Sequence, residues 1–214
     1  MHVELLIEDL SGKKAMDILI PKLIDNGMPV ITHSYKGIGR IPKNLKPKTD
    51  ASKRQLLDQL PHLLQGYGKV PECKSVIVIC DLDNKDKQLF LSELNKVLES
   101  CYPKPDAIFC LAIEEFEAWY LGDLSAVNKA YPHAKNNVLN KYINDSICGT
   151  WEVLADAVYK GGSKELRKRG WQEIGEQKSV WAELISPYMN VDDNKSPSFI
   201  EMRNQLRGII VEKQ

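Results

Sequence analysis

Acidic side chains directly follow apolar segments of the sequence that are typical of buried strands. Glu8 follows one such segment, and Asp81 and Asp83 follow another. Side chains two positions apart on an extended backbone point to the same side, so the two aspartates are expected to converge. Carboxylates about 4 Å apart repel by roughly 4 kcal/mol at an effective dielectric constant of about 20. Such a cluster takes up a proton or a cation, and Glu8, Asp81 and Asp83 are predicted to bind Mg²⁺ or Mn²⁺.

A further group of carboxylates follows a third apolar segment. Glu114 is a candidate for a second metal-binding position, and Glu117 is the preferred candidate for a general base. Trp119 is expected to pack in the core and to hold the helix that presents Glu117. Structural roles stay open for the acids of the first two segments, because Glu8 alone can be a solvent-exposed turn residue and Asp83 or Asn84 can cap the next helix.

Positive side chains form two groups that are candidate contacts for a nucleic-acid backbone. The first lies in the segment 36–48, which carries five cations and no acid, and the second in the segment 160–169, where a glycine pair precedes a helix. The alternative for both groups is a solvent-exposed surface without a ligand, which explains the first group as well and the second group better. Lys178 lies outside them and is expected either to pair with an acid or to reach a phosphate. The candidates for contacts with nucleic acid are Lys36, Arg40, Lys43, Lys164 and Lys178.

The first half of the chain is expected to supply the elements that position these residues. Consecutive apolar residues in the strand segments indicate a sheet covered on both faces, as in parallel sheets. The alternation of strand and helix predicts an α/β fold with a mostly parallel sheet flanked by helices, and ligands of such sheets gather at the carboxyl ends of the strands. The predicted strands are 3–7, 29–35, 75–80 and 106–113, and the predicted helices cover 15–23 after a turn at 11–12, 52–64 and 85–100.

The second half of the chain has a different pattern. After residue 122 no strand is evident, and apolar residues such as Trp151, Leu154 and Val158 recur at helical spacing. We therefore expect a metal-binding α/β domain over 1–122 and a helical extension over 123–214 that packs on it. Ser198, with Glu201 three residues later, predicts a capping box at the start of the last helix.

Composition narrows the classes of function. The formal net charge is zero, so nucleic-acid binding must come from local patches. The five cysteines are scattered, which favours a reducing compartment, and the four histidines lack the spacing of zinc ligands. No signal segment or membrane-spanning apolar run is evident, so we expect a cytoplasmic protein with no membrane contact. The oligomeric state stays open.

The acidic pattern resembles the Toprim domain, in which a glutamate after the first strand and a DxD motif after the third hold Mg²⁺ for phosphodiester chemistry. Within that group the chain resembles the family called domain of unknown function 4276. The chain departs from the Toprim pattern at Asp9, where many members have glycine, and it lacks a glycine soon after Asp83. The matching segments are Leu6–Asp9, Asp81–Asp83, Ile113–Trp119, Lys178–Ala182 and Ser196–Phe199.

The resemblance implies a Toprim-like, Rossmann-like fold and a metal-dependent nuclease acting on DNA or RNA. Families of this kind are often found beside ATPases of the overcoming-lysogenization-defect type in phage-defence or abortive-infection modules, so it also implies a neighbouring ATPase of the AAA or ABC type as a partner. Two other functions stay open. One is a non-catalytic, Toprim-like regulatory or partner-binding subunit, and the other is a receiver-like phosphotransfer domain.

Overall fold

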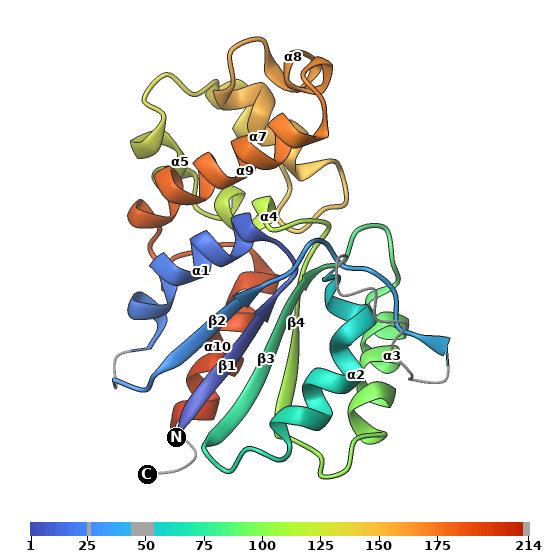
Figure 1. Ribbon diagram of the computed structural model, residues 1–214. Helices are drawn as coiled ribbons and strands as arrows, with labels where there is room; N and C mark the ends of the chain where they lie inside the picture. Colours follow the sequence, from blue (N-terminus) through green and yellow to red (C-terminus); the bar gives the residue numbers. More distant parts are fainter. Residues whose placement is uncertain (25–26, 44–53, 212–214) are drawn as a thin grey trace.

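A parallel sheet forms the centre of the protein, as seen in a computed structural model that describes residues 1–24, 27–43 and 54–211. Its four strands lie in the order β2-β1-β3-β4, and all of the pairings are parallel (Figure 1). The α/β fold and the parallel sheet predicted from the sequence are therefore confirmed. The strands are β1 (His2–Ile7), β2 (Val30–Ser34), β3 (Cys73–Asp81) and β4 (Ala107–Ala112).

Helices cover both faces of the sheet because the strands carry apolar side chains on both. Leu5 and Ile7 of β1 join one core with α1 (Leu10–Leu23) and α10 (Pro197–Val211). Leu6 points to the opposite face and joins a second core, to which two other helices contribute. These two helices are α2 (Leu56–Tyr67) and α3 (Lys87–Glu99).

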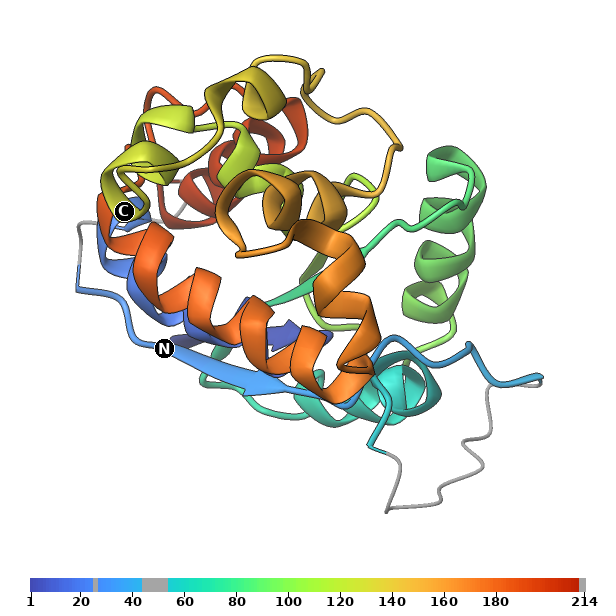
Figure 2. The ribbon, with the colours of Figure 1, turned by 90° about the horizontal axis from the view of Figure 1, so that it is seen from above.

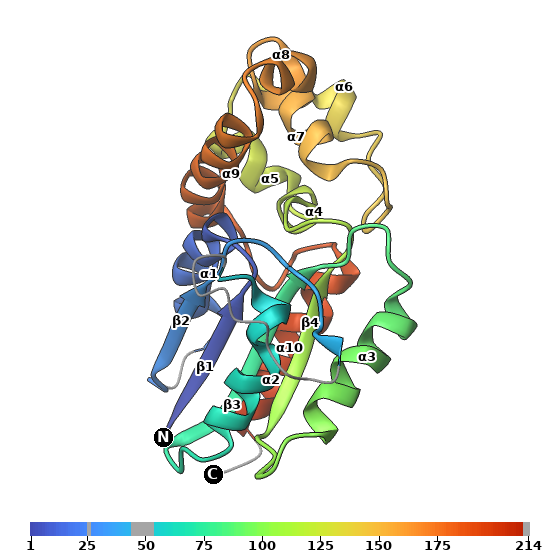
Figure 3. The same cartoon turned by 45° about the vertical axis from the view of Figure 1, so that its right-hand side comes forward.

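Further helices lie beyond the carboxyl ends of the strands, where Figures 1 and 3 show them above the sheet. The last two long helices return to the sheet domain: α9 packs along α1, and α10 packs against β4. Figure 2 shows α9 crossing the molecule when it is viewed from this end. These helices are α4 (Glu117–Leu121), α5 (Leu124–Ala130), α6 (Asn136–Leu139), α7 (Thr150–Val158), α8 (Gly162–Lys168), α9 (Trp171–Ile185) and the 3₁₀ helix η2 (Ser186–Tyr188).

Helix α1 begins earlier than the sequence predicted. Asp9 is its N-cap, with its carboxylate accepting hydrogen bonds from Gly12 N–H at 2.7 Å and from the Ser11 hydroxyl at 2.7 Å. The predicted turn at Ser11 and Gly12 is wrong, since both residues belong to the first helical turn. A Cβ atom at Gly12 would lie 2.9 Å from Cγ2 of Ile7, so the lack of a side chain allows α1 to lie close to β1.

The last helix is capped by a different serine from the one predicted. Ser196 Oγ accepts a hydrogen bond from Phe199 N–H at 3.2 Å, and Pro197 is the first helical residue, the position where proline is favoured. Ser198 instead accepts a hydrogen bond from the Trp119 indole at 3.0 Å. The predicted capping box at Ser198 is therefore wrong, and its partner Glu201 pairs with Lys87 on α3.

Two further predictions concern the character of the chain. In the part that the structure describes, no helix has the length and apolar content needed to cross a membrane. Cys80 and Cys110 are buried and have free thiols, as expected for small apolar core residues.

Candidate functional site

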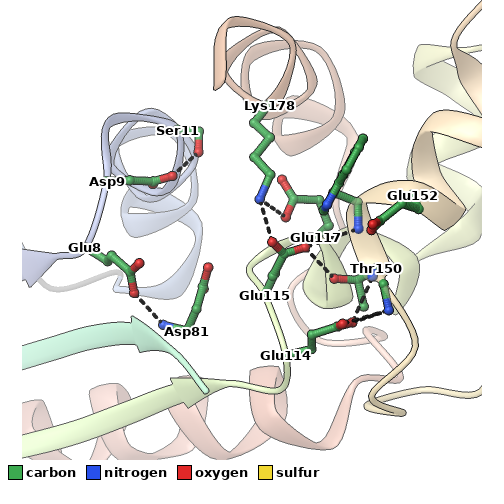
Figure 4. Close-up of polar contacts among 12 residues, drawn as sticks. Glu8, Asp9, Ser11, Asp81, Glu114, Glu115, Glu117, Thr150, Glu152 and Lys178 are labelled. Atoms are coloured by element: carbon green, nitrogen blue, oxygen red, sulfur yellow. Dashed lines mark hydrogen bonds and ion pairs between the residues drawn. The ribbon is translucent and has the colours of Figure 1, made fainter. Parts of the chain in front are cut away.

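Glu8 and Asp81 lie side by side at the carboxyl edge of the sheet. Glu8 follows β1 and Asp81 ends β3, and these are the two central, adjacent strands. The chain leaves β1 toward β2 on one side and leaves β3 toward β4 on the other, so this is the switch point where parallel sheets bind ligands. The Glu8 carboxylate accepts a hydrogen bond from Asp81 N–H at 3.0 Å, and Figure 4 shows the two side chains close together.

Both carboxyl groups hold protons more tightly than usual. Burial raises the pKa of Glu8 to about 7, with the nearby charges of Asp9 and Asp83 adding to the effect. Burial also raises the pKa of Asp81 well above its ordinary value, and the charge of Glu8 raises it further. Burial and the charges of the neighbouring acids therefore both disfavour the ionised forms of the two groups.

Glu117 lies at the start of α4 and is buried, with 1% of its surface exposed. Its Oε2 atom is 3.3 Å from Lys178 Nζ, yet this oxygen has no hydrogen-bond partner among the described residues. Burial raises the pKa of Glu117 to about 7, although the charge of Lys178 lowers it. Glu117 can therefore exchange a proton near neutral pH, which is the property a general base needs.

Lys178 on α9 is the cation of this region. Its ammonium group lies 3.0 Å from Glu115 Oε1 as well as near Glu117, so of the two roles left open for it the structure shows the ion pair. Burial alone would lower the pKa of Lys178, but the carboxylates of Glu117, Glu115 and Asp81 raise it more, and the net shift is upward. Lys178 is therefore charged at neutral pH. We call Glu8, Asp81, Glu115, Glu117 and Lys178 the acidic cluster (Figure 4).

Glu115 and Asp9 are members of this region that the sequence analysis did not assign. Glu115 was visible only as part of a run of acids after the third apolar segment. Its link to Lys178 joins positions 63 residues apart, and no local pattern signals it. Asp9 had a local signal, because an aspartate three residues before Gly12 and next to the end of a strand is a typical N-cap.

Asp83 does not face Glu8 and Asp81 in the way the sequence predicted. Strand β3 ends at Asp81, and Asp83 has a φ angle of 51°, so the extended backbone assumed for the convergence of the two aspartates is wrong here. The Asp83 side chain is 49% exposed and lies 2.7 Å from Lys85 Nζ. Neither Asp83 nor Asn84 caps the next helix, because Asp86 accepts the capping hydrogen bond from Leu89 N–H.

Glu114 points away from Glu8 and Asp81 in Figure 4. Its backbone is left-handed, with a φ angle of 62°, and its carboxylate accepts hydrogen bonds at the start of α7. The donors are the N–H groups of Cys148 (3.2 Å), Gly149 (2.7 Å) and Thr150 (2.8 Å). An N-terminus with free N–H groups favours such an anion, so in this structure Glu114 joins the end of β4 to α7.

Replacing Glu114 with glutamine is expected to lower the free energy of unfolding by about 1–2 kcal/mol. The amide NH₂ group cannot accept hydrogen bonds, so part of the contact with the start of α7 is lost. Urea denaturation measures the change. Glu99→Gln is the control, because Glu99 makes only an exposed pair with Lys104. Equal stabilities of the Glu114→Gln protein and the wild type would contradict the role assigned to Glu114.

The first group of candidate nucleic-acid contacts lies in the segment that follows β2. Lys36, Arg40 and Lys43 are exposed there. Lys46 and Lys48 of the same basic stretch lie outside the described residues. The contact of this segment with nucleic acid therefore stays a prediction.

Lys164, from the second basic group, is exposed on the short helix α8. The glycine pair before this helix does not leave the neighbouring backbone N–H available to an anion, because Ser163 N–H donates to the Asp156 carboxylate at 2.7 Å. Lys178, the remaining candidate, lies apart from both basic groups in the acidic cluster. The structure thus does not bring the candidate cations together at one place.

Whether a divalent ion fits this site depends on the oxygen ligands that Glu8, Asp81 and their neighbours can offer. Among the described residues no group of three or more histidine, cysteine, aspartate or glutamate side chains is arranged to hold a metal ion. Mg²⁺ in proteins, however, keeps several waters and is commonly held by one or two carboxylates together with substrate phosphates. Glu8 and Asp81 supply two such carboxylates, and the buried Oε2 of Glu117 lacks a hydrogen-bond partner. The residues therefore fit a water-rich Mg²⁺ or Mn²⁺ site.

The raised pKa of Glu8 predicts how stability depends on pH. The pKa of Glu8 is about 7 in the folded state, against 4.5 for an ordinary glutamate. Its contribution to the free energy of unfolding is therefore fully present below pH 4.5 and is lost as pH rises through 7. Glu8→Gln removes the charge, so without divalent ions it is expected to raise the free energy of unfolding by about 1–2 kcal/mol at pH 8 and by almost nothing at pH 4. Urea denaturation at the two pH values measures this, and a loss of stability at pH 8 would contradict it.

Comparison with known proteins gives one match. A family model described as "Domain of unknown function (DUF4276)" matches residues 7–207, which is nearly the whole chain and includes every member of the acidic cluster. No curated protein and no solved structure matches the chain.

Proposed function

The chain belongs to the DUF4276 family, and from its acidic cluster we propose that it is a divalent-metal-dependent nuclease that hydrolyses phosphodiester bonds in DNA or RNA. The observation that carries the proposal is the pair of carboxyl groups of Glu8 and Asp81 at the switch point of a parallel sheet. When both groups are ionised their charges repel each other, and a cation bound between them would offset that repulsion. The resemblance of the sequence pattern to the Toprim domain supports the same chemistry.

Glu8 and Asp81 would hold Mg²⁺ or Mn²⁺, which when bound neutralises charge on the phosphate and makes a coordinated water more acidic. When its four carboxyl groups are ionised, the acidic cluster sets one ammonium group against four negative charges, so a bound cation would lower the repulsion of an anionic substrate. Asp83, the third predicted ligand, is paired with Lys85 in this structure.

Glu117 is proposed as the general base. Its carboxylate takes a proton from the attacking water, the water oxygen forms a bond to phosphorus, and the bond from phosphorus to the leaving oxygen breaks, with that oxygen taking a proton from solvent. The buried Oε2 of Glu117, which has no hydrogen-bond partner among the described residues and lies 3.3 Å from Lys178 Nζ, is the proposed acceptor for this proton. Lys178 holds Glu117 and Glu115 in place through its two ion pairs and limits the charge of the cluster.

The test compares the wild type with Asp81→Asn, using Glu99→Gln as a control acid on the surface. We expect the wild type to bind Mn²⁺ and to cleave DNA or RNA only with Mg²⁺ or Mn²⁺, and Asp81→Asn to lose both by at least about 100-fold. Calorimetry measures binding, and gel assays measure cleavage. The assays are run with and without an ATPase of the type that the resemblance implies as a partner. Equal Mn²⁺ binding by wild type and Asp81→Asn would show that the site is misassigned.

A second candidate function, a non-catalytic subunit, is favoured because two of the predicted acids are bound to other parts of the chain. Glu114 is bound to the start of α7 and Asp83 to Lys85, so fewer carboxylates face the switch point than a two-metal nuclease uses. A non-catalytic subunit that binds an ion and a partner protein would need no more. Mn²⁺ binding that is lost in Asp81→Asn, without cleavage of any nucleic acid alone or with the ATPase, would favour this function.

A further inference from the structure

A cavity of about 490 Å³ lies between α2, α3 and the segment that follows β2. Figure 3 shows this segment crossing α2 toward α3. Its apolar lining comes from Leu57 on α2 and Phe90 and Val97 on α3, which are at most 3% exposed and form its floor, and from the half-buried Ile41. The volume is within the range of small-molecule pockets, and the apolar lining suits a flat, weakly polar group such as a nucleobase.

The polar part of the lining is mainly cationic. Arg40, Lys85 and Lys96 line the cavity together with a single acid, Glu93. Three cations against Glu93 and the Asp83 carboxylate that pairs with Lys85 leave one excess positive charge. A ligand that combines an apolar ring with a negative charge therefore matches both parts of the cavity.

Backbone hydrogen bonds fix the wall formed by the segment after β2. Gly37 N–H donates to Glu8 C=O at 3.1 Å, and Leu57 N–H donates to Ile38 C=O at 2.8 Å. Arg40 N–H donates to the Asp58 carboxylate at 3.0 Å. Gly39 has a φ angle of 69°, and a Cβ there would lie 2.7 Å from Gln55 Cβ, so the wall requires glycine at this position. A wall held in this way is formed before any ligand binds, which lowers the entropic cost of binding.

The cavity is connected to the acidic edge of the sheet through Lys85. The Lys85 ammonium lies 5.0 Å from the centre of the Phe90 ring inside the cavity and 2.7 Å from Asp83 Oδ2, which follows β3. At its other end the cavity wall starts from the hydrogen bond to Glu8. The cavity therefore lies beside the proposed catalytic site, and a ligand in it can extend toward Glu8 and Asp81.

We propose that this cavity binds one nucleotide, with the base against Leu57, Phe90 and Ile41 and the phosphate between Arg40, Lys85 and Lys96. In choosing a nucleotide of the substrate strand as the occupant, the proposal rests on the proposed nuclease function. The chemistry that the cavity recognises is a base joined to a phosphate, and this is shared by a strand and by a free nucleotide.

The first experiment measures binding of adenosine 5′-monophosphate by calorimetry without divalent ions. We expect Arg40→Ala/Lys96→Ala and the cavity-filling variant Ile41→Trp each to weaken binding at least about tenfold, and adenosine or inorganic phosphate alone to bind more weakly than the nucleotide. Lys69→Ala/Lys129→Ala is the matched control, because it removes two exposed lysines outside the cavity. Equal binding by wild type and both cavity variants, or no binding at all, overturns the proposal.

A second comparison separates this proposal from the proposed function. If a four-nucleotide single strand binds more tightly than the monophosphate and loses that affinity in Arg40→Ala/Lys96→Ala, the occupant is a nucleotide of a strand. If the monophosphate binds more tightly, the occupant is a free nucleotide, and the choice of a strand is overturned. Nucleotide binding that depends on the cavity, in a protein that never cleaves nucleic acid, supports the cavity and refutes the nuclease. Metal-dependent cleavage that is unchanged in both cavity variants refutes the cavity and leaves the nuclease standing.

Discussion

Lys178→Met is expected to lower the free energy of unfolding by about 3–5 kcal/mol at pH 8, because it removes the cation from a buried ion pair. Glu117 is 1% exposed and would then lack a counter-ion, so at pH 8 it must either stay ionised and unpaired or take up a proton, and both cost stability. Without Lys178 its pKa must rise above about 7, since that cation now lowers it against the effect of burial. Near pH 5 Glu117 is protonated, so the loss of stability should be much smaller there.

The double variant Glu117→Gln/Lys178→Met tests the cause of this loss. Without the buried carboxylate the double variant should regain most of the stability at pH 8. Some loss remains, because Glu115 still lacks its ion pair with Lys178. The control is Lys14→Met, which breaks the pair with Glu183, where the two side chains are 34% and 53% exposed. An exposed pair contributes at most about 1 kcal/mol. Urea denaturation at pH 5 and pH 8 measures all three variants, and a loss of equal size at both pH values would contradict this role of Lys178.

Trp119→Ala is expected to cost about 3–5 kcal/mol of stability, since it removes a fully buried indole from the core. The Trp119 ring packs against Phe116, 4.4 Å between centroids, and against Phe199 of α10 at 5.6 Å. The substitution also leaves Ser198 Oγ without its indole donor. Because Trp119 follows Glu117 on the short helix α4, activity should fall along with stability.

A second variant at Trp119 separates packing from hydrogen bonding, and a variant at Trp171 serves as the control. Trp119→Phe keeps most of the ring and loses the bond to Ser198, so it should cost less than Trp119→Ala. Trp171→Ala is the matched control, because Trp171 is 80% exposed and its removal should change stability by no more than about 0.5 kcal/mol. Thermal and urea denaturation measure the series. Equal effects of Trp119→Ala and Trp171→Ala would show that the indole of Trp119 is not part of the core.

Some residues of the site could be placed from sequence because they lie next to strong local signals. The consecutive apolar residues of β3 marked a strand covered on both faces, and the same reasoning located β1, so Glu8 and Asp81 had to follow two strands of one sheet. Parallel pairing then brings the carboxyl ends of strands to one edge. That edge is where the structure has Glu8 and Asp81, while the binding of a metal ion there stays a prediction.

Other residues could not be placed, because their surroundings come from distant parts of the chain. Glu114 follows β4 as predicted, but three backbone N–H groups at the start of α7 bind its carboxylate and turn it away from the switch point. Asp83 lies two residues after Asp81, yet a left-handed φ angle ends the extended geometry between them. Ser196, and not Ser198, caps α10, because Ser198 is bound to Trp119, 79 residues earlier.

The sequence by itself determined the order of strands and helices along the chain, the parallel sheet and the two acids at the carboxyl ends of its strands, since apolar periodicity and chain connectivity are local properties. That these two strands are the adjacent, central ones was decided by the tertiary structure. Only the tertiary structure decided which charges meet. The pairing of Lys178 with Glu115 and Glu117 arises because α9 brings Lys178 to the start of α4 beyond the end of the sheet, in an environment poor in water. Burial of that kind sets the protonation of Glu8 and Glu117, and it depends on every element that covers them.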